Sequence, residues 1–254
     1  MKKKILAIFM ATMMSVSIAA CGSSGESADT EATPGVTEEA EATPEATPET
    51  TVTPEVTEEI ATPTQAEQVI APYESDLTSG AYYVGFHIPE GVYNVTVNSG
   101  VGNILTKTGI TSALGSASGV SYADSYNNLT LANGDVLTVT QSLNIKLSTQ
   151  EAYYSTMQPY DNPATEPVEL SAGSYVIGQD VPAGIYDMVA TGDLVTVNTS
   201  DLNVNASLTN NETLAVSSAI SYKNAELLEG ATLTVQSGSV TLTPTADITP
   251  LTPQ

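Results

Sequence analysis

Few side chains in this 254-residue chain could act as catalysts. It has one histidine, His87, one cysteine, Cys21, and no tryptophan, and its six basic residues are all lysines. With a single imidazole and a single thiol, most pairs of a nucleophile and a base are ruled out. The 29 acidic residues leave paired carboxylates as a route to hydrolysis, but no pair stands in a recognisable context. We therefore expect a protein without enzymatic activity.

One stretch has the spacing of a calcium-binding loop. Asp201, Asn203 and Asn205 carry side-chain oxygens at alternate positions, and Glu212 follows at the twelfth position of the same window. Oxygen ligands at this spacing can converge on Ca²⁺. Against this, Ala206 stands where such a loop needs glycine, and alternating apolar and polar residues are typical of a half-exposed strand. Calcium is the one metal that the sequence suggests, and no other cofactor is expected.

Twelve tyrosines could supply rings that stack on sugars. Tyr153, Tyr154 and Tyr160 lie close together in the segment between two repeated modules, which makes them candidate ligand-binding residues. The alternative is that these rings wedge the modules together. The matched tyrosines of the repeated motif described next, Tyr82, Tyr93, Tyr175 and Tyr186, are expected to be structural.

The elements that must position these side chains come from an internal duplication. Residues 80–93, GAYYVGFHIPEGVY, recur 93 positions later as residues 173–186, GSYVIGQDVPAGIY. Aromatic and β-branched residues on both sides of each motif predict strands. Proline second and glycine fourth in residues 88–91 and 181–184 predict a tight turn between the two strands.

Further turn signals recur in both copies. Asn133-Gly134 lies between two apolar runs and predicts a type I′ hairpin turn, with Glu229-Gly230 at the matching place. The tripeptide at 120–122, Val-Ser-Tyr, is matched in the same way with Ile-Ser-Tyr at 220–222. Each copy therefore consists of several short strands joined by loops.

No segment shows the period of an amphipathic helix, so we predict an all-β fold. It consists of two tandem small modules, each a β-sandwich or a jelly-roll-like barrel, after a disordered acidic linker. The predicted boundaries are a signal peptide at 1–20, a linker at 21–76, module 1 at 77–150, an inter-module linker at 151–168, module 2 at 169–243 and a polar tail at 244–254.

The linker is predicted from a sharp change in composition. Residues 21–76 are rich in Thr, Pro, Glu and Ala, and they hold fourteen acidic residues and no lysine. Such a stretch buries too little apolar surface to offset the entropy of ordering the chain. Beyond residue 21 only Lys107, Lys146 and Lys223 oppose the 29 acidic residues. Nucleic acid is excluded as a partner, because almost nothing neutralises its phosphates.

The N-terminus has the features of a secretory signal. Three lysines at residues 2–4 precede a largely apolar run that ends in small residues. The end of this run, Ile18 to Cys21, resembles the lipobox of bacterial lipoproteins. The resemblance implies that Cys21 becomes the lipid-bearing first residue of a mature chain anchored on the extracellular face of the cell membrane. An ordinary signal peptidase site with an incidental cysteine is the alternative.

The duplicated motif carries a second resemblance. Its pattern of Gly-x-Asp, then Pro-x-Gly-x-Tyr, is similar to a β repeat of surface lipoproteins from Firmicutes, which are Gram-positive bacteria. Copy one departs from the pattern by having His87 where copy two has an aspartate. The resemblance implies architecture and location rather than an activity. In copy two the pattern is carried by Gly178, Asp180, Pro182, Gly184 and Tyr186.

These observations favour a non-enzymatic surface lipoprotein that presents two β modules for adhesion, cell-wall contact or protein binding. Its expected partners are the membrane, through the lipid on Cys21, and a cell-wall glycan or an extracellular protein. A carbohydrate-binding module near the cell surface is the alternative function, and a carboxylate-based hydrolase is the third.

Overall fold

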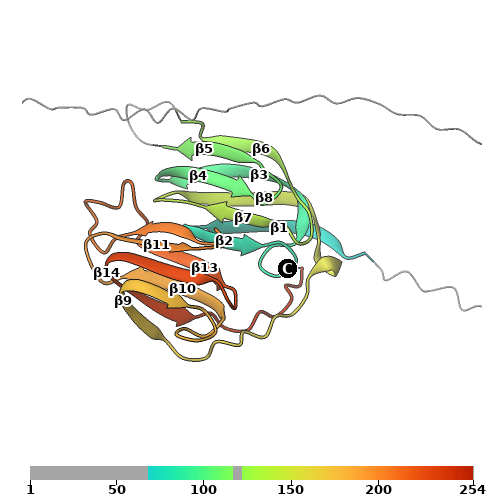
Figure 1. The fold of residues 1–254 in the computed structure, drawn as a ribbon. Coiled ribbons are helices and arrows are strands. Elements are labelled where there is room, and N and C mark those ends of the chain that lie inside the picture. Colours follow the sequence, from blue (N-terminus) through green and yellow to red (C-terminus); the bar gives the residue numbers. More distant parts are fainter. Residues whose placement is uncertain (1–67, 117–121, 254) are drawn as a thin grey trace, which may run out of the picture. The chain divides into compact units, whose positions relative to one another are not determined.

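The computed structural model describes residues 68–116 and 122–253, and this part of the chain is all-β (Figure 1). The predicted fold class is therefore confirmed. The predicted signal peptide, Cys21 and the predicted linker up to residue 67 lie outside the described residues. Within the described ranges the helical structure is limited to one 3₁₀ turn, and we find no apolar helix of membrane-spanning length there.

Strands account for most of the described chain, and they divide into two groups along the sequence. The first group is β1 (Ile70–Leu77), β2 (Gly80–Tyr83), β3 (Glu90–Ser99), β4 (Val101–Thr106), β5 (Thr111–Gly115), β6 (Ser125–Leu131), β7 (Val136–Val139) and β8 (Asn144–Tyr153), followed by the 3₁₀ turn η1 (Tyr154–Thr156). The second group is β9 (Val168–Val176), β10 (Gly184–Ala190), β11 (Val195–Thr199), β12 (Asn205–Leu208), β13 (Ser221–Leu227) and β14 (Thr232–Pro244).

Module 1 is a sandwich of two antiparallel layers. One layer is a four-stranded sheet of order β1-β8-β3-β6, and the other is the stretch β2-β7-β4-β5 of a ten-stranded sheet. Burial alternates along β3, β4 and β7, as expected for strands with one face against a core. The core includes the large side chains of Tyr82, Tyr93, Ile104, Leu129 and Ile145.

Module 2 builds the same sandwich from fewer and longer strands. β9 and β14 pair with each other along both layers, and β14 also pairs with β10 in one layer and with β11 in the other. The register of β14 against β9 shifts between Val235 and Ser239, where Ser237 and Gly238 have positive φ angles. Such a bulge bends a strand, which lets β14 pass from one layer to the other. A second core fills this sandwich and includes Tyr186, Met188, Val197, Leu233 and Leu242.

The two modules correspond strand by strand. β6 and β13 have the same pattern, Ser-Tyr-x-Asn-apolar-x-Leu, and the asparagine has a positive φ in both, 58° at Asn128 and 53° at Asn224. Tyr126 is thus the counterpart of Tyr222. The predicted match of Tyr122 with Tyr222 is therefore wrong, and residues 120 and 121 of that match lie outside the described residues.

The turn of the repeated motif comes earlier than predicted. It occupies residues 85–87 rather than 88–91, and the backbone N–H of His87 donates to the carbonyl of Tyr83 at 2.8 Å. Gly85 has a φ of 95°, a conformation that glycine adopts without strain. The Pro–Gly spacing was a misleading signal here, because Pro89 comes after the turn and directly before β3.

The tyrosine that ends each copy of the motif holds the segment before it in place. Tyr93 is fully buried and its hydroxyl donates to the carbonyl of Pro89 at 2.6 Å. Tyr186 does the same to Pro182 at 2.9 Å in module 2. A buried hydroxyl needs such a partner, so the prediction that these tyrosines are structural agrees with their contacts.

The Asn133-Gly134 turn exists, but the predicted hairpin is wrong. The N–H of Asp135 donates to Ala132 at 2.9 Å, and only the second central residue, Gly134, has a positive φ, of 84°. This is the pattern of a type II turn rather than type I′. The strands on either side, β6 and β7, lie in different layers, so the turn carries the chain across the sandwich. Gly230 repeats this geometry at a φ of 83°.

Module 1 begins earlier than the predicted boundary at residue 77. β1 starts at Ile70 and pairs with β8, and alternate residues along it turn toward the core. The ring of Tyr73 packs edge-on against that of Tyr93, with 6.0 Å between the centroids. The outward positions hold Pro72 and Glu74, which gave this strand the composition of the preceding linker.

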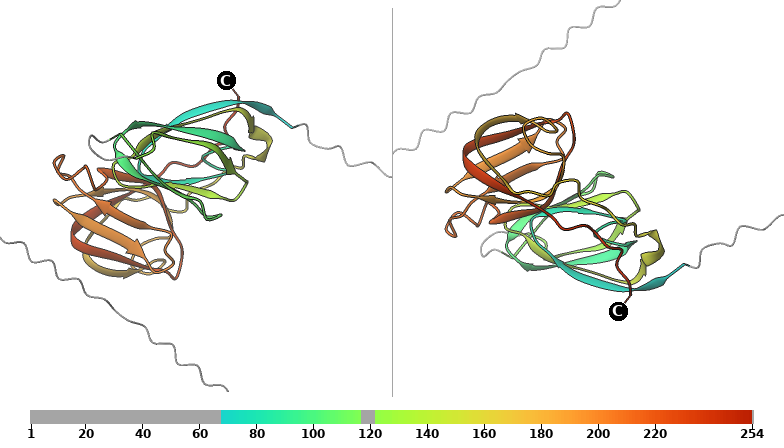
Figure 2. Two further views of the ribbon diagram at one scale, coloured as in Figure 1. Left: turned by 90° about the horizontal axis from the view of Figure 1, so that it is seen from above. Right: turned by 90° about the horizontal axis from the view of Figure 1, so that it is seen from below.

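The inter-module linker and the predicted polar tail pack against each other. β14 continues to Pro244, and beyond it Tyr160 and Ile248 exchange two backbone hydrogen bonds of 3.0 and 2.8 Å. Both views in Figure 2 place the C-terminal end beside β1, where Leu251 lines a hollow next to Tyr73. The tail is therefore a strap that returns to module 1.

Asn162 ties this linker to module 2 and to the strap. Its side-chain amide donates to the carbonyls of Ile185 at 2.7 Å and of Thr245 at 2.9 Å. Its side-chain oxygen accepts from the N–H groups of Ile185 at 3.1 Å and of Ala164 at 3.2 Å. Its own N–H donates to Asp247 at 2.9 Å. The buried amide is thus fully satisfied.

A junction joins the two modules. β13 lies parallel to β2 through the pair Lys223 and Gly80, and the N–H of Lys223 donates to the carbonyl of Ser79 at 2.9 Å. Nearby, the hydroxyl of Ser142 donates to the carbonyl of Val216 at 3.1 Å. The junction makes one continuous ten-stranded sheet from strands of both copies.

Candidate binding groove

An open groove of about 590 Å³ lies beside this junction. One wall comes from β2, β4 and β7 of module 1, and the other comes from β13 and the loop between β11 and β12. The apolar lining residues are Tyr83, Leu105, Val136, Leu202, Tyr222 and Leu228. The polar ones include Thr106, Lys107, Thr138, Thr140, Asn203, Asn205 and Glu226.

Leu202 is the most exposed large apolar side chain of the described residues, at 79%, and it lines this groove. Its φ is 64°, a conformation that costs a leucine about 1–2 kcal/mol. The loop holds it there: the N–H of Leu202 donates to the carbonyl of Thr199 at 3.0 Å, and the Thr199 hydroxyl accepts from the N–H of Val204 at 3.1 Å. A strained backbone that displays an apolar side chain is typical of a contact site.

The predicted calcium ligands take part in the same loop. Asp201 accepts hydrogen bonds from the hydroxyl of Thr199 at 2.5 Å and from the N–H of Asn203 at 3.1 Å. Asn205 starts β12, and Glu212 lies exposed in a turn beyond that strand. The structure therefore brings Asp201 and Asn203 together as a brace of the loop. In residues 68–116 and 122–253 no three His, Cys, Asp or Glu side chains are grouped to hold a metal ion.

The groove holds one carboxyl group among its lining residues. Burial raises the pKa of Glu226 above its ordinary value, and the nearby Tyr83 and Lys107 offset part of that rise. Burial also raises the pKa values of Tyr83 and Tyr222, so both phenols are protonated at neutral pH. The groove can thus donate hydrogen bonds from phenols and contact apolar groups.

The groove also holds the most available lysine of the described chain. Lys146 pairs with Glu74 at 2.6 Å, and Lys223 pairs with Asp187 at 2.5 Å. Lys107 is exposed and makes no ion pair with any described residue. It can therefore offer its charge to a ligand without first breaking an internal contact.

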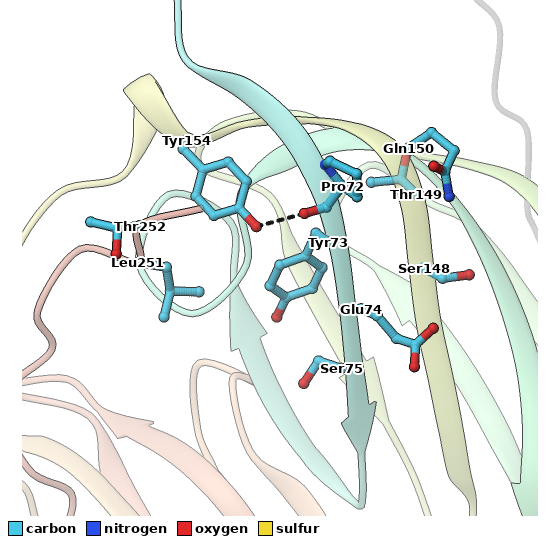
Figure 3. A pocket seen from close by; sticks show the side chains of 10 residues that line it. All are labelled: Pro72, Tyr73, Glu74, Ser75, Ser148, Thr149, Gln150, Tyr154, Leu251 and Thr252. Atoms are coloured by element: carbon cyan, nitrogen blue, oxygen red, sulfur yellow. Dashed lines mark hydrogen bonds between the residues drawn. The ribbon is translucent and has the colours of Figure 1, made fainter. Parts of the chain in front are cut away.

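The three candidate tyrosines are not brought to one site. Tyr154 lines a second hollow, of about 460 Å³, and its hydroxyl donates to the carbonyl of Pro72 at 2.9 Å (Figure 3). Figure 3 shows the ring of Tyr73 and the side chain of Leu251 beside it. Tyr160 instead packs edge-on against Phe86, with 5.8 Å between centroids. Tyr153 ends β8 and is not among the residues that line this hollow.

The single histidine has a structural partner. The Nδ1 atom of His87 accepts the N–H of Tyr83 at 3.1 Å, and in copy two the carboxylate of Asp180 accepts the N–H of Val176 at 2.8 Å. Histidine and aspartate thus perform the same task in the two turns. This explains why the motif tolerates the exchange, and it gives neither residue a role in the groove.

Sequence reasoning missed the residues that make the groove. Tyr83 has no tyrosine at its matching position in copy two, where Val176 stands, and Glu226 lies in an ordinary strand pattern. The one available signal was Leu202, an apolar residue between Asp201 and Asn203, where a turn was compatible with the sequence. Comparison with protein-family models and with curated protein sequences finds no match to this chain.

Proposed function

We propose that the protein is a non-enzymatic surface lipoprotein whose groove binds a polypeptide segment of an extracellular partner. Support for polypeptide comes from the lining, which combines the exposed side chains of Leu202 and Leu228 with phenol, amide and hydroxyl groups. Apolar anchors between hydrogen-bonding edges are typical of sites that hold an extended chain.

The observation that carries the proposal is the display of Leu202. A leucine that is 79% exposed gains about 1.5–3 kcal/mol when a partner buries it. Its strained loop is braced by Asp201, so the side chain is held in place before a partner arrives. Preorganisation of this kind lowers the entropic cost of binding.

Selection from a displayed random-peptide library tests this site. The probe is the lipid-free chain from Gly22 to Gln254, and the counter-screen is its Leu202→Asp variant. We expect the selected peptides to bind Leu202→Asp at least tenfold more weakly, which corresponds to about 1.4 kcal/mol. Val216→Asp is the matched control, because Val216 is 65% exposed and does not line the groove. Equal loss in both variants, or no enriched peptide, would refute the proposed site.

The anchor is the second part of the proposal. Lipid on Cys21 would hold the groove at the extracellular face of the membrane, and the acidic composition of residues 21–67 would keep that segment away from anionic surfaces. Metabolic labelling with a clickable fatty acid should mark the protein and should fail with Cys21→Ser. Labelling that persists in Cys21→Ser would remove the anchor from the account.

A carbohydrate is the second candidate ligand, and the hollow around Tyr154 favours it. Tyr73 and Tyr154 offer aromatic surface there, and Ser148, Thr149 and Gln150 offer hydrogen bonds. A glycan array probed with the same chain and with Tyr154→Ala tests this idea. A signal that disappears in Tyr154→Ala supports the glycan, and an array without signal retires it.

A further inference from the structure

The junction between the modules is close-packed on the side of β2. A Cβ atom built on Gly80 would lie 2.6 Å from the carbonyl oxygen and 2.7 Å from the Cβ of Lys223. Gly80 and Ala81 are both buried, and Ala81 belongs to the core of module 2. This small-residue start of β2 is therefore shaped to receive the edge of β13.

Because the chain is duplicated, each half of the junction occurs twice. The counterpart of β13 is β6, and the counterpart of β2 is the C-terminal half of β9, where Gly173 matches Gly80. The junction uses β2 of copy one and β13 of copy two. The junction therefore does not use two corresponding edges: the edge of β9 that matches β2, and the edge of β6 that matches β13.

Both leftover edges lack a neighbour within the described chain. β6 is the terminal strand of its sheet and pairs only with β3, and β9 pairs only with β14. The surface they present is exposed: Gly173 and Ser174 are exposed where Gly80 and Ala81 are buried. Asn127 is exposed where its counterpart Lys223 is partly covered.

We propose that a second copy of this chain completes these edges, so that β9 of one copy lies parallel to β6 of the next. In this contact the N–H of Asn127 donates to the carbonyl of Ala172 of the neighbouring copy, as the N–H of Lys223 does to Ser79 within one chain. The two surfaces differ, so the contact is head-to-tail and leaves a free edge at each end. Such contacts grow into chains of copies unless the rotation closes a ring.

The proposed contact between β9 and β6 is more polar than the junction between β2 and β13 within one chain. Ser174 stands in place of Ala81 and Val176 in place of Tyr83, and Asn127 lacks the charge with which Lys223 pairs to Asp187. The acidic chain also repels itself at low salt. Association is therefore weak, with a dissociation constant on the order of 0.1–1 mM, and it strengthens as salt screens the charge.

Two variants separate the two edges. Gly173→Arg fills the β9 edge. The nearest atom to a Cβ there is the hydroxyl oxygen of Tyr175 at 3.3 Å, at the end of a partly exposed side chain that needs to shift by only a few tenths of an ångström. Asn127→Pro removes the N–H donor of the β6 edge, where proline is tolerated at a strand edge. If circular dichroism shows that Asn127→Pro is unfolded, Thr130→Arg on the exposed side of β6 replaces it.

Analytical ultracentrifugation of the lipid-free chain 22–254, at up to about 1 mM in 0.5 M salt, gives the decision. We expect the average mass of the unchanged chain to rise beyond that of a dimer, and each variant alone to remain monomeric. A mixture of the two variants has one complementary pair of edges, so it should form dimers and stop there. The exposed-site variant Val216→Arg should associate as the unchanged chain does.

Three results would overturn the proposal. The unchanged chain could stay monomeric over the whole range, its oligomers could persist in Gly173→Arg, or the mixture of variants could fail to dimerise. Each of these outcomes leaves the peptide groove untouched, because none of the changed residues lines it.

Discussion

Replacing Asn162 by alanine should lower the free energy of unfolding more than the loss of any other single side-chain amide in the described chain. The substitution leaves the N–H groups of Ile185 and Ala164 without the acceptor that they have at 3.1 and 3.2 Å. It also removes the donor to the carbonyl of Thr245. Each buried group left unpaired costs about 1–3 kcal/mol, and water that enters the vacated space recovers part of it. We expect a loss of about 3 kcal/mol.

Urea unfolding followed by circular dichroism measures this loss. With a slope of about 2 kcal/mol per molar urea, the midpoint for Asn162→Ala should fall by about 1.5 M. Asn98→Ala is the matched control, since Asn98 is exposed and its amide donates only to Asp76 and Asn144. We expect the control to change stability by less than about 0.5 kcal/mol. Equal midpoints for the two variants would show that the hydrogen bonds of Asn162 do not fasten the inter-module linker to module 2.

Three further predictions concern titrating and hydroxyl groups. Burial lowers the pKa of His87 to about 4, so the unfolded chain takes up a proton on this histidine at a higher pH than the folded chain does. The free energy of unfolding should therefore fall by up to about 3 kcal/mol as the pH drops from about 6.5 to 4. His87→Asn keeps an acceptor for the N–H of Tyr83, so urea unfolding at each pH should show a smaller fall in stability between about pH 6.5 and 4 for this variant. An unchanged fall would mean that other groups cause it. Burial raises the pKa of Glu226, so its stabilising effect is present at low pH and is lost as the pH rises. Glu226→Gln should therefore raise the melting temperature slightly at pH 7 and lose that advantage near pH 4, whereas a lower melting temperature at pH 7 would contradict the burial argument. Tyr93→Phe and Tyr186→Phe each remove a hydrogen bond to a proline carbonyl and should each cost about 1 kcal/mol, and a neutral result in thermal unfolding would mean that the carbonyl finds another donor.

The parts of the fold that follow from local patterns were predictable from the sequence. The duplicated motif, the alternation of its strands and the turn at Asn133-Gly134 all depend on neighbouring residues. Which strands pair does not, because pairing depends on how the two layers close over the core. The turn was therefore placed correctly, while its hairpin was not.

Composition misled the boundaries for a physical reason. Pro72 and Glu74 lie on the outward face of β1, so the averaged composition resembled the linker although the inward residues belong to a strand. Asn162 gave no signal, since its partners at Ile185 and Thr245 lie far along the chain. The groove was missed for the same reason, because Tyr83 and Leu202 come from different modules.

The most direct test of a polypeptide-binding groove is NMR mapping on the lipid-free chain, titrated with a peptide selected on that chain. We expect the amide signals of Tyr83, Val136, Leu202, Glu226 and Leu228 to shift, and we expect Leu202→Asp to abolish the shifts. Shifts confined to Tyr73, Tyr154 and Leu251, or spread over both modules without regard to the groove, would contradict this expectation.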